Sequence, residues 1–124
     1  MNSLTTALAA ASSGMDAQAM RLRHVSENIA NADTPGYQRK IATFQIADGG
    51  VRLGPLRLDD RPGQRVHDPA HPLADQTGHY DGSNVDLIME LADAREAQRG
   101  YEANLRIFDQ ARQMMQSLFD LIRR

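Results

Sequence analysis

Two stretches at opposite ends of the chain carry apolar residues at alternating steps of four and three, and this spacing constrains the fold more than any other feature. In the first stretch every position except Gln18 is apolar, and the series is Leu4, Leu8, Ala11, Met15, Gln18, Leu22, Val25 and Ile29. In the second every position except Gln98 and Arg112 is apolar, and the series is Leu87, Leu91, Ala94, Gln98, Tyr101, Leu105, Phe108, Arg112, Met115, Phe119 and Ile122. A period of about 3.5 residues is typical of paired helices in a left-handed coiled coil. The pattern predicts two long helices, each with one apolar stripe.

The first helix is predicted to span residues 4–31. It should end there because the sequence Thr34-Pro35-Gly36-Tyr37 has the pattern of a type II turn. Proline stands where a φ near about −65° is needed, and glycine stands where a positive φ is needed.

The second helix is predicted over residues 85–122. Ser83 or Asn84 can cap its free backbone N–H groups, and the charge of Asp86 suits the positive end of the helix dipole. Arg123 and Arg124 carry the complementary charge at the other end. At about 1.5 Å per residue such a helix is roughly 57 Å long, which is more than a compact chain of this size would cover.

The segment between the helices is rich in glycine and proline and is predicted to be irregular. Short strands are indicated at residues 41–46, 51–53 and 56–58, with a small hairpin turning at Gly54-Pro55. We therefore expect a mainly α chain whose two helices form a coiled-coil-like hairpin around a small loop and β segment. Its parts are residues 1–37, 38–83 and 84–124, which together make one structural unit.

Composition excludes several kinds of protein. Aromatic residues make up only 5% of the 124 residues and tryptophan is absent, so the large anchors of a thick globular core are scarce. The net charge of −2 offers no basic field for nucleic acid. Without cysteine there are no disulfides, thiolate metal sites or cysteine nucleophiles. No apolar run is long enough to span a membrane, and the absence of Lys or Arg before Arg21 argues against a cleaved signal peptide.

The stripes cannot stabilise the chain alone, because burying them gains less free energy than ordering the helices costs. We expect neighbouring subunits to cover them, and the chain ends to be loose in the monomer and to order on polymerisation. The residues predicted to form helix interfaces are Leu4, Leu8, Met15, Leu22, Val25, Ile29, Leu87, Leu91, Tyr101, Leu105, Phe108, Met115, Phe119 and Ile122.

Histidines and carboxylates cluster in one part of the middle segment. The cluster is His67, Asp68, His71, Asp75 and His79. These are ligand types that zinc accepts, so a metal-binding regulatory module using His67, His71 and His79 is one alternative. Prolines interrupt the cluster and forbid a regular helix that would align the ligands. We therefore predict a solvated, turn-forming segment with no metal or other cofactor.

The one adjacent pair of carboxylates, Asp59-Asp60, is flanked by Arg57 and Arg61 in a predicted turn. That arrangement is typical of surface charge rather than of a catalytic pocket. We expect no catalytic residues, no small-molecule substrate and no enzyme activity.

Four motifs then stand in a recognisable order. They are Ser26-Glu27-Asn28-Ile29-Ala30-Asn31-Ala32-Asp33-Thr34-Pro35-Gly36-Tyr37, then His67-Asp68-Pro69-Ala70-His71-Pro72-Leu73-Ala74-Asp75 with Gly78, then Asn84-Val85-Asp86, and last Tyr101-Glu102-Ala103-Asn104. The first resembles the N-terminal signature of the bacterial flagellar rod and hook family, with Asp33 in place of the usual Asn. The order and the short length resemble the proximal-rod proteins, and the second motif most resembles their C type rather than their B type. The motif residues are Asn28, Ala30, Asn31, Thr34, Pro35, Gly36, Tyr37, Asp68, Pro69, His71, Pro72, Asn84, Val85, Asp86, Tyr101, Ala103 and Asn104.

The resemblance implies a structural subunit of the flagellar rod that transmits torque. It implies export without cleavage through the flagellar type III apparatus, and a rod that runs from the inner-membrane ring across the periplasm toward the hook. The implied partners are copies of the chain itself, other rod proteins, the export apparatus and the inner-membrane ring.

The amides of Asn28, Asn31 and Asn104 are expected to fix register between helices or to satisfy backbone groups at the turn. The alternative to a rod subunit is a soluble coiled-coil adaptor or secretion chaperone that binds one partner through its exposed stripe.

Overall fold

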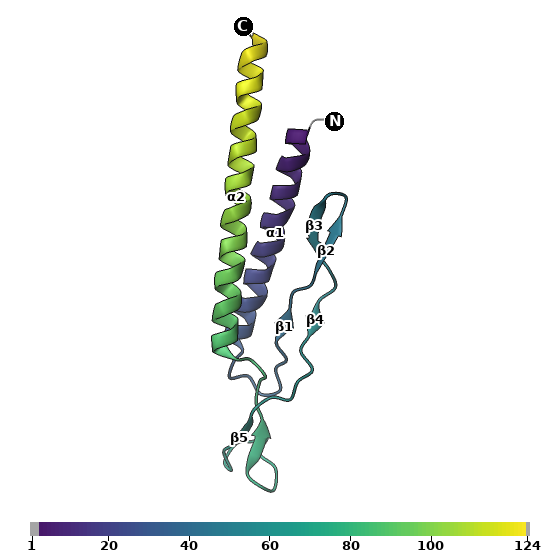
Figure 1. Ribbon diagram of the computed structural model, residues 1–124. Helices are drawn as coiled ribbons and strands as arrows, with labels where there is room; N and C mark the ends of the chain where they lie inside the picture. Colours follow the sequence, from purple (N-terminus) through teal and green to yellow (C-terminus); the bar gives the residue numbers. More distant parts are fainter. Residues whose placement is uncertain (1–2, 124) are drawn as a thin grey trace.

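The computed structural model describes residues 3–123 and contains two long helices with three small pairs of strands between them (Figure 1). The helices are α1 (Ser3–Ala30) and α2 (Leu87–Arg123). The strands are β1 (Lys40–Ile41), β2 (Phe44–Ala47), β3 (Gly50–Leu53), β4 (Arg57–Leu58), β5 (Arg65–His67) and β6 (His79–Asp81). The predicted mainly α fold with an irregular middle is confirmed, and both helices lie within a few residues of their predicted bounds. Arg124, expected at the end of the second helix, lies outside the described residues.

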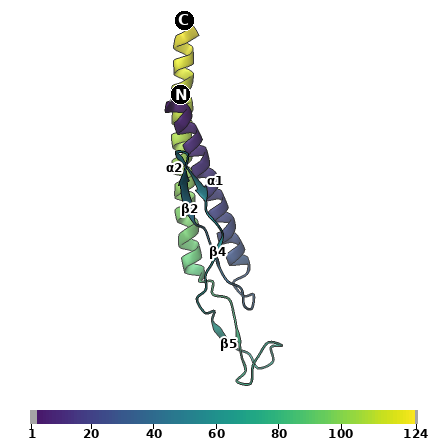
Figure 2. The same ribbon diagram turned by 90° about the vertical axis from the view of Figure 1, so that its right-hand side faces the viewer.

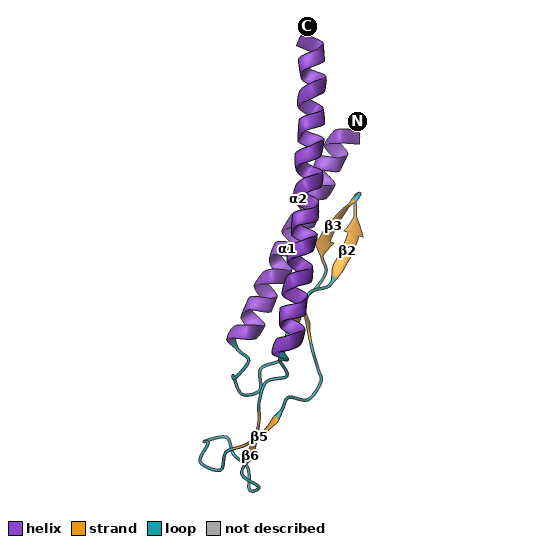
Figure 3. Ribbon diagram, turned by 60° about the vertical axis from the view of Figure 1, so that its left-hand side comes forward, coloured by secondary structure: helices purple, strands orange, loops and turns teal. Residues whose placement is uncertain are grey.

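The helices pack side by side in opposite directions, so the predicted hairpin is antiparallel (Figures 1 and 3). Gly14 faces Asn104, Gln18 faces Gly100, and Asn28 bonds to Glu90, so each step forward along α1 is matched by an equal step back along α2. By the same register, Ser3 lies opposite Met115. The last two turns of α2 therefore extend past the described start of α1.

Small residues make the contact between the helices. The buried residues are Ala11, Gly14, Ala17, Val25 and Asn28 on α1, and Glu90, Ala97 and Ala111 on α2. A Cβ on Gly14 would lie 2.7 Å from the Asn104 side chain, and a Cβ on Gly100 would lie 2.7 Å from that of Gln18. The helices approach closely because these positions lack bulk. The stripe that holds this hairpin together is thus offset from the large-residue stripe that the sequence emphasised.

Most of the predicted interface residues lie beside this contact or outside it. Val25 is buried, and Leu4, Leu8, Met15, Leu22, Phe108 and Met115 are half-buried. The exposed ones are Ile29, Leu87, Leu91, Tyr101, Leu105, Phe119 and Ile122. Their place in contacts between subunits stays a prediction.

Residues 40–58 form one long hairpin, and its turn is not the predicted one. β2 pairs with β3 and β1 pairs with β4, both antiparallel. The chain reverses at Asp48 and Gly49, whose φ values of 53° and 75° suit a two-residue type I′ turn. The predicted turn at Gly54-Pro55 is wrong: these residues lie between β3 and β4 on one side of the hairpin, and the Gly54 N–H donates to the Thr43 carbonyl on the other side at 2.7 Å. The two-residue turn wins because its twist matches that of the flanking strands.

The long hairpin lies along α1, as Figures 1 and 2 show. The Val51 N–H donates to Ser13 Oγ at 3.0 Å, and the absent side chain of Gly50 leaves room for that serine. The second hairpin, β5 with β6, projects beyond the end of the helix pair (Figure 3).

Candidate functional site

The residues after α1 form the predicted turn. The Tyr37 N–H donates to the Thr34 carbonyl at 3.2 Å, and Gly36 has a φ of 73°, as position three of a type II turn requires. Asn31 donates twice to the Glu27 carbonyl at the helix end, from its backbone N–H at 3.1 Å and from Nδ2 at 2.8 Å. The first motif therefore stops α1 and sends the chain back along it.

Asn28 is the centre of a buried polar cluster at the base of the helix pair. Its side chain is fully buried. Nδ2 donates to the Lys40 carbonyl at 3.0 Å and to Glu90 Oε2 at 3.1 Å. Oδ1 accepts the Lys40 N–H and the Tyr37 hydroxyl, both at 2.8 Å. One amide thus connects α1, the segment after the turn and α2.

Arg39 connects Glu90 on α2 to Asp59 in the segment after β4. Its Nε donates to Glu90 Oε1 at 2.7 Å and its Nη2 to Asp93 Oδ2 at 3.1 Å, while Nη1 lies 3.5 Å from Asp59 Oδ2. Both Arg39 and Asp59 are buried. Burial opposes the charge of Arg39, but the hydrogen bond to Glu90 and the nearby carboxylates outweigh it, and the pKa of the guanidinium rises.

Asp59 is held on its other side by Arg61, whose Nη2 donates to Oδ2 at 2.6 Å. This hydrogen bond, together with one from the Arg61 backbone N–H, lowers the pKa of Asp59 to about 2. Asp59 was predicted to be surface charge, and that prediction is wrong. Asp59 directly follows β4, which pairs with β1 and so brings Asp59 to Arg39. Asp60 beside it is exposed.

Asn84 fastens the segment before α2 to the rest of the base. Its Oδ1 accepts the Arg39 N–H at 2.7 Å, and its Nδ2 donates to the carbonyls of Asp59 at 2.9 Å and Arg61 at 3.0 Å. It does not cap the helix. Asp86 does, because its Oδ1 accepts the Ile88 N–H at 3.0 Å.

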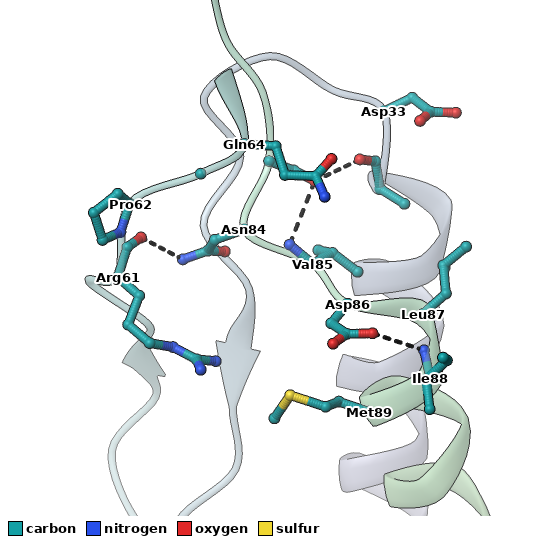
Figure 4. Close-up of a pocket in the computed structure, with 13 residues that line it drawn as sticks. Asp33, Arg61, Pro62, Gln64, Asn84, Val85, Asp86, Leu87, Ile88 and Met89 are labelled. Carbon is teal, nitrogen blue, oxygen red and sulfur yellow. Dashed lines mark hydrogen bonds between the residues drawn. The ribbon is translucent and has the colours of Figure 1, made fainter. Parts of the chain in front are cut away.

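Ser83, the other predicted cap, instead donates to the Ala32 carbonyl, and Ala32 follows α1. The stretch from Ser83 to Asp86 therefore ties both helix ends together. Figure 4 labels Asn84, Val85 and Asp86 and shows the cap of α2 and the contact between Arg61 and Asn84.

The motif residues Tyr101, Ala103 and Asn104 lie on different faces of α2. Asn104 is half-buried against Gly14, and its Nδ2 donates to the Gly100 carbonyl at 2.8 Å. Tyr101 and Ala103 are exposed on the neighbouring faces. Asn104 thus lies in the helix contact, while its motif neighbours face outward.

The second motif folds on itself in the loop between β5 and β6. Asp75 accepts from Thr77, from Arg65 and from the His79 backbone, and these bonds, that of Thr77 foremost, hold the pKa of Asp75 well below its usual range. The His71 ring stacks on Tyr80 with centroids 3.9 Å apart. Asp68, Pro69 and Pro72 are exposed. In residues 3–123 no three His, Asp or Glu side chains gather as metal ligands would.

Sequence reasoning missed Glu90 and Arg39, the buried charges of the cluster. One signal was present for Glu90: it stands seven residues before Ala97, which stands seven before Asn104 and fourteen before Ala111. These positions share one helix face. Arg39 gave no such signal, because only the return of the chain along α1 brings it to Glu90.

Large apolar side chains remain exposed along α2, in a stripe that we name the α2 apolar stripe. Its members share one face of the helix and are Leu87, Leu91, Tyr101, Leu105 and Phe119; other faces of α2 expose Ile88, Ile107, Met114, Leu118, Leu121 and Ile122. By contrast, Val25 is the largest buried apolar side chain among residues 3–123. So much exposed apolar surface marks a protein contact. Within residues 3–123, neither helix has an apolar stretch that could cross a bilayer.

Comparisons with known proteins agree with this architecture. The family model "Flagella basal body rod protein" matches residues 1–38, and "Flagellar basal body rod FlgEFG protein C-terminal" matches residues 76–121. The flagellar basal-body rod protein FlgC of Agrobacterium fabrum is 42% identical over 99% of this chain and 98% of its own length. The proteins of the same name from Escherichia coli O6:H1 and Aquifex aeolicus are 32% and 28% identical, over 85% and 97% of this chain and 87% and 98% of their own lengths.

These relatives support the predicted family and not the adaptor or chaperone alternative. The matched regions contain α1, α2 as far as Leu121, and the buried cluster's residues Asn28 and Glu90. The chain belongs to the flagellar basal-body rod protein family.

Proposed function

We propose that the chain is a structural subunit of the flagellar basal-body rod that polymerises through its terminal helices and transmits motor torque. The α2 apolar stripe carries this proposal. It lies outside the contact that α1 makes with α2, so folding of one chain leaves it in water. Burial against neighbouring rod subunits removes that surface from water at a gain of about 25 cal/mol per Å².

Rigidity follows from the two kinds of contact. Inside the subunit, Gly14 and Gly100 hold the helices close, and the cluster around Asn28 fixes one register. Between subunits, large side chains packed at interior density have few alternative positions. Sliding one helix past another under load would remove apolar side chains from their sites along the whole stripe.

The location and the partners follow from the same proposal. The rod extends from the inner-membrane ring through the periplasm, and this chain reaches it through the flagellar type III export apparatus without cleavage. Its neighbours are copies of itself and other rod proteins. The role requires no catalysis, cofactor or nucleic acid.

The test is complementation of a normally motile bacterium from which the gene for its own copy of this protein has been deleted. The wild-type chain should restore swimming and rods in imaged basal bodies. The double variant Leu91→Lys with Leu105→Lys places two charges in the α2 apolar stripe and should abolish both. The matched control, Gln113→Lys with Gln116→Lys, changes two exposed polar residues of the same helix.

Circular dichroism of the purified chains should show equal helix content for both double variants, since all four positions are exposed. Normal swimming by the Leu91→Lys, Leu105→Lys strain would contradict assembly through this stripe. Failure of the wild-type chain to enter basal bodies would contradict the rod function itself.

A further inference from the structure

A groove opens at the base of the helix pair, next to the buried cluster but not part of it. Three chain segments line it: Ala32 with Asp33 after α1, residues 61–64, and residues 83–89 at the start of α2 (Figure 4). The cavity measures about 590 Å³, which is room for several large side chains.

The walls of the groove are held by hydrogen bonds. The Gln64 N–H donates to the Ser83 carbonyl at 3.2 Å, and the Gly82 N–H donates to the Gln64 carbonyl at 2.7 Å. Asn84 Nδ2 donates a hydrogen bond to the Arg61 carbonyl, and the Asp86 side chain caps α2 by accepting the Ile88 N–H. The groove is thus formed before any occupant arrives, which lowers the entropy cost of binding.

The surface of the groove is apolar and acidic. Leu87, Ile88 and Met89 expose large side chains, and Ile88 is 81% exposed. Two exposed carboxylates, Asp33 and Asp86, stand beside them. The one cation in the lining, Arg61, is bound to Asp59 at 2.6 Å. The matching occupant is therefore apolar with a basic end.

The opposite end of this molecule shows what such an occupant looks like. The last two turns of α2 have no α1 beside them in the described residues and expose Leu118, Phe119, Leu121 and Ile122, the last at 79%. Arg123 lies in the final turn, and the sequence continues with Arg124. Among the side chains of residues 116–124, one is negative, Asp120, and two are positive, Arg123 and Arg124. At about 1.5 Å per residue, residues 116–123 extend roughly 12 Å past α1.

We propose that the basal groove receives the C-terminal helix tip of a neighbouring rod subunit, an apolar helix end with a basic residue in its last turn, of the kind that this chain itself carries. The groove and the tip lie at opposite ends of the α2 axis (Figure 1). Contacts between unlike ends build open filaments when the rotation from one subunit to the next does not close into a ring. This inference rests on the proposed rod function and adds an axial contact to the lateral ones made by the stripe.

The experiment places a photo-reactive benzophenone amino acid at position 88 of the full chain in the complementing strain. Basal bodies are irradiated and isolated, and the cross-linked peptides are identified by mass spectrometry. The expected product joins position 88 to the last two turns of a rod subunit's C-terminal helix. The same amino acid at position 107, an exposed position of α2 far from the groove, is the matched control and should not reach such a tip.

Charge provides the second arm. Asp33→Lys should reduce the position-88 product at least fivefold, because it repels the arginines of the tip, whereas Asp16→Lys, an exposed change on α1, should leave the yield unchanged. Rods that contain the chain but give no product, or give one that maps elsewhere, overturn the inference and leave the rod function intact. Absence of the chain from rods overturns the proposed function instead.

Discussion

Asn28 Nδ2 on α1 donates to Glu90 Oε2 on α2 at 3.1 Å, and both side chains are fully buried. This bond joins the last turn of one helix to the first turn of the other. A slip of either helix by one turn would break this bond and leave a buried amide N–H and a buried carboxylate oxygen one partner short, and an unsatisfied buried polar group costs more than the bond itself gains. The pair therefore fixes the register of a helix contact that is otherwise built from small, interchangeable residues.

Asn28→Leu should destabilise the chain by about 2 to 4 kcal/mol, because it strips partners from the Lys40 backbone, the Tyr37 hydroxyl and Glu90 while preserving volume. Urea unfolding followed by circular dichroism measures the change. Asn31→Leu is the control, since that side chain is partly exposed and touches only its own turn, and about 1 kcal/mol is expected. Equal losses in the two variants would argue against a central role for Asn28.

Gly14→Val should push the helices apart, because even a Cβ at this position would lie 2.7 Å from the Asn104 side chain. We expect a loss of about 1 to 3 kcal/mol in the free energy of unfolding. Ala9→Val places the same side chain at an exposed position of the same helix and should cost less than about 1 kcal/mol, mostly from helix propensity. If Ala9→Val proved as harmful, close packing at Gly14 would not be the cause.

Asn104→Leu should impair swimming and basal-body yield more than it impairs the solubility of the isolated chain. The Asn104 amide bonds to the Gly100 carbonyl and faces Gly14. A branched apolar side chain at this position should displace α1, but it adds no apolar group to the exposed surface, so solubility should change little. Swimming assays and counts of purified basal bodies give the result. Wild-type values for both would remove the idea that Asn104 sets subunit geometry.

Stability should fall as the pH drops from about 4 to about 2. The folded chain lowers the pKa of Asp59 from its ordinary 3.8 to about 2 through the hydrogen bonds from Arg61. A depressed carboxyl pKa stabilises the fold above the unfolded pKa, and that contribution is lost as the pH falls through the folded pKa. Urea midpoints measured between pH 2 and 5 should therefore decline. Asp59→Asn should flatten this decline, whereas Asp60→Asn, an exposed neighbour, should follow the wild type.

The backbone amides of residues 4–31 should be more strongly protected against hydrogen exchange in assembled rods than in the isolated chain. The prediction follows from the exposed α2 apolar stripe and the scarcity of large buried side chains, which leave the lone hairpin with little burial to offset its conformational entropy. Backbone amides of the same residues are compared in the two states. Equal protection in both would show that the monomer is already fully ordered.

The sequence by itself determined the two long helices, because a 3.5-residue apolar period and a Thr-Pro-Gly-Tyr turn allow few other structures. It also determined the family, through motifs that are local in the chain. The face that each helix turns to the other could not be read this way. Large apolar side chains dominate the periodic pattern, yet the intramolecular contact uses the small stripe of Gly14, Ala97 and Gly100, and much of the large-residue stripe stays exposed.

The tertiary structure decided the buried cluster, but not the turn of the long hairpin. Arg39 meets Glu90 and Asp59 only because the chain runs back along α1, and no local pattern encodes contacts between residues so far apart in sequence. Sequence reasoning missed the turn at Asp48-Gly49 although Asp-Gly is a strong local signal for a type I′ hairpin. That turn lets β3 dock on Ser13 while Asp59 reaches Arg39. The tertiary structure alone decided the buried cluster, because its contacts depend on long-range burial and hydrogen bonding.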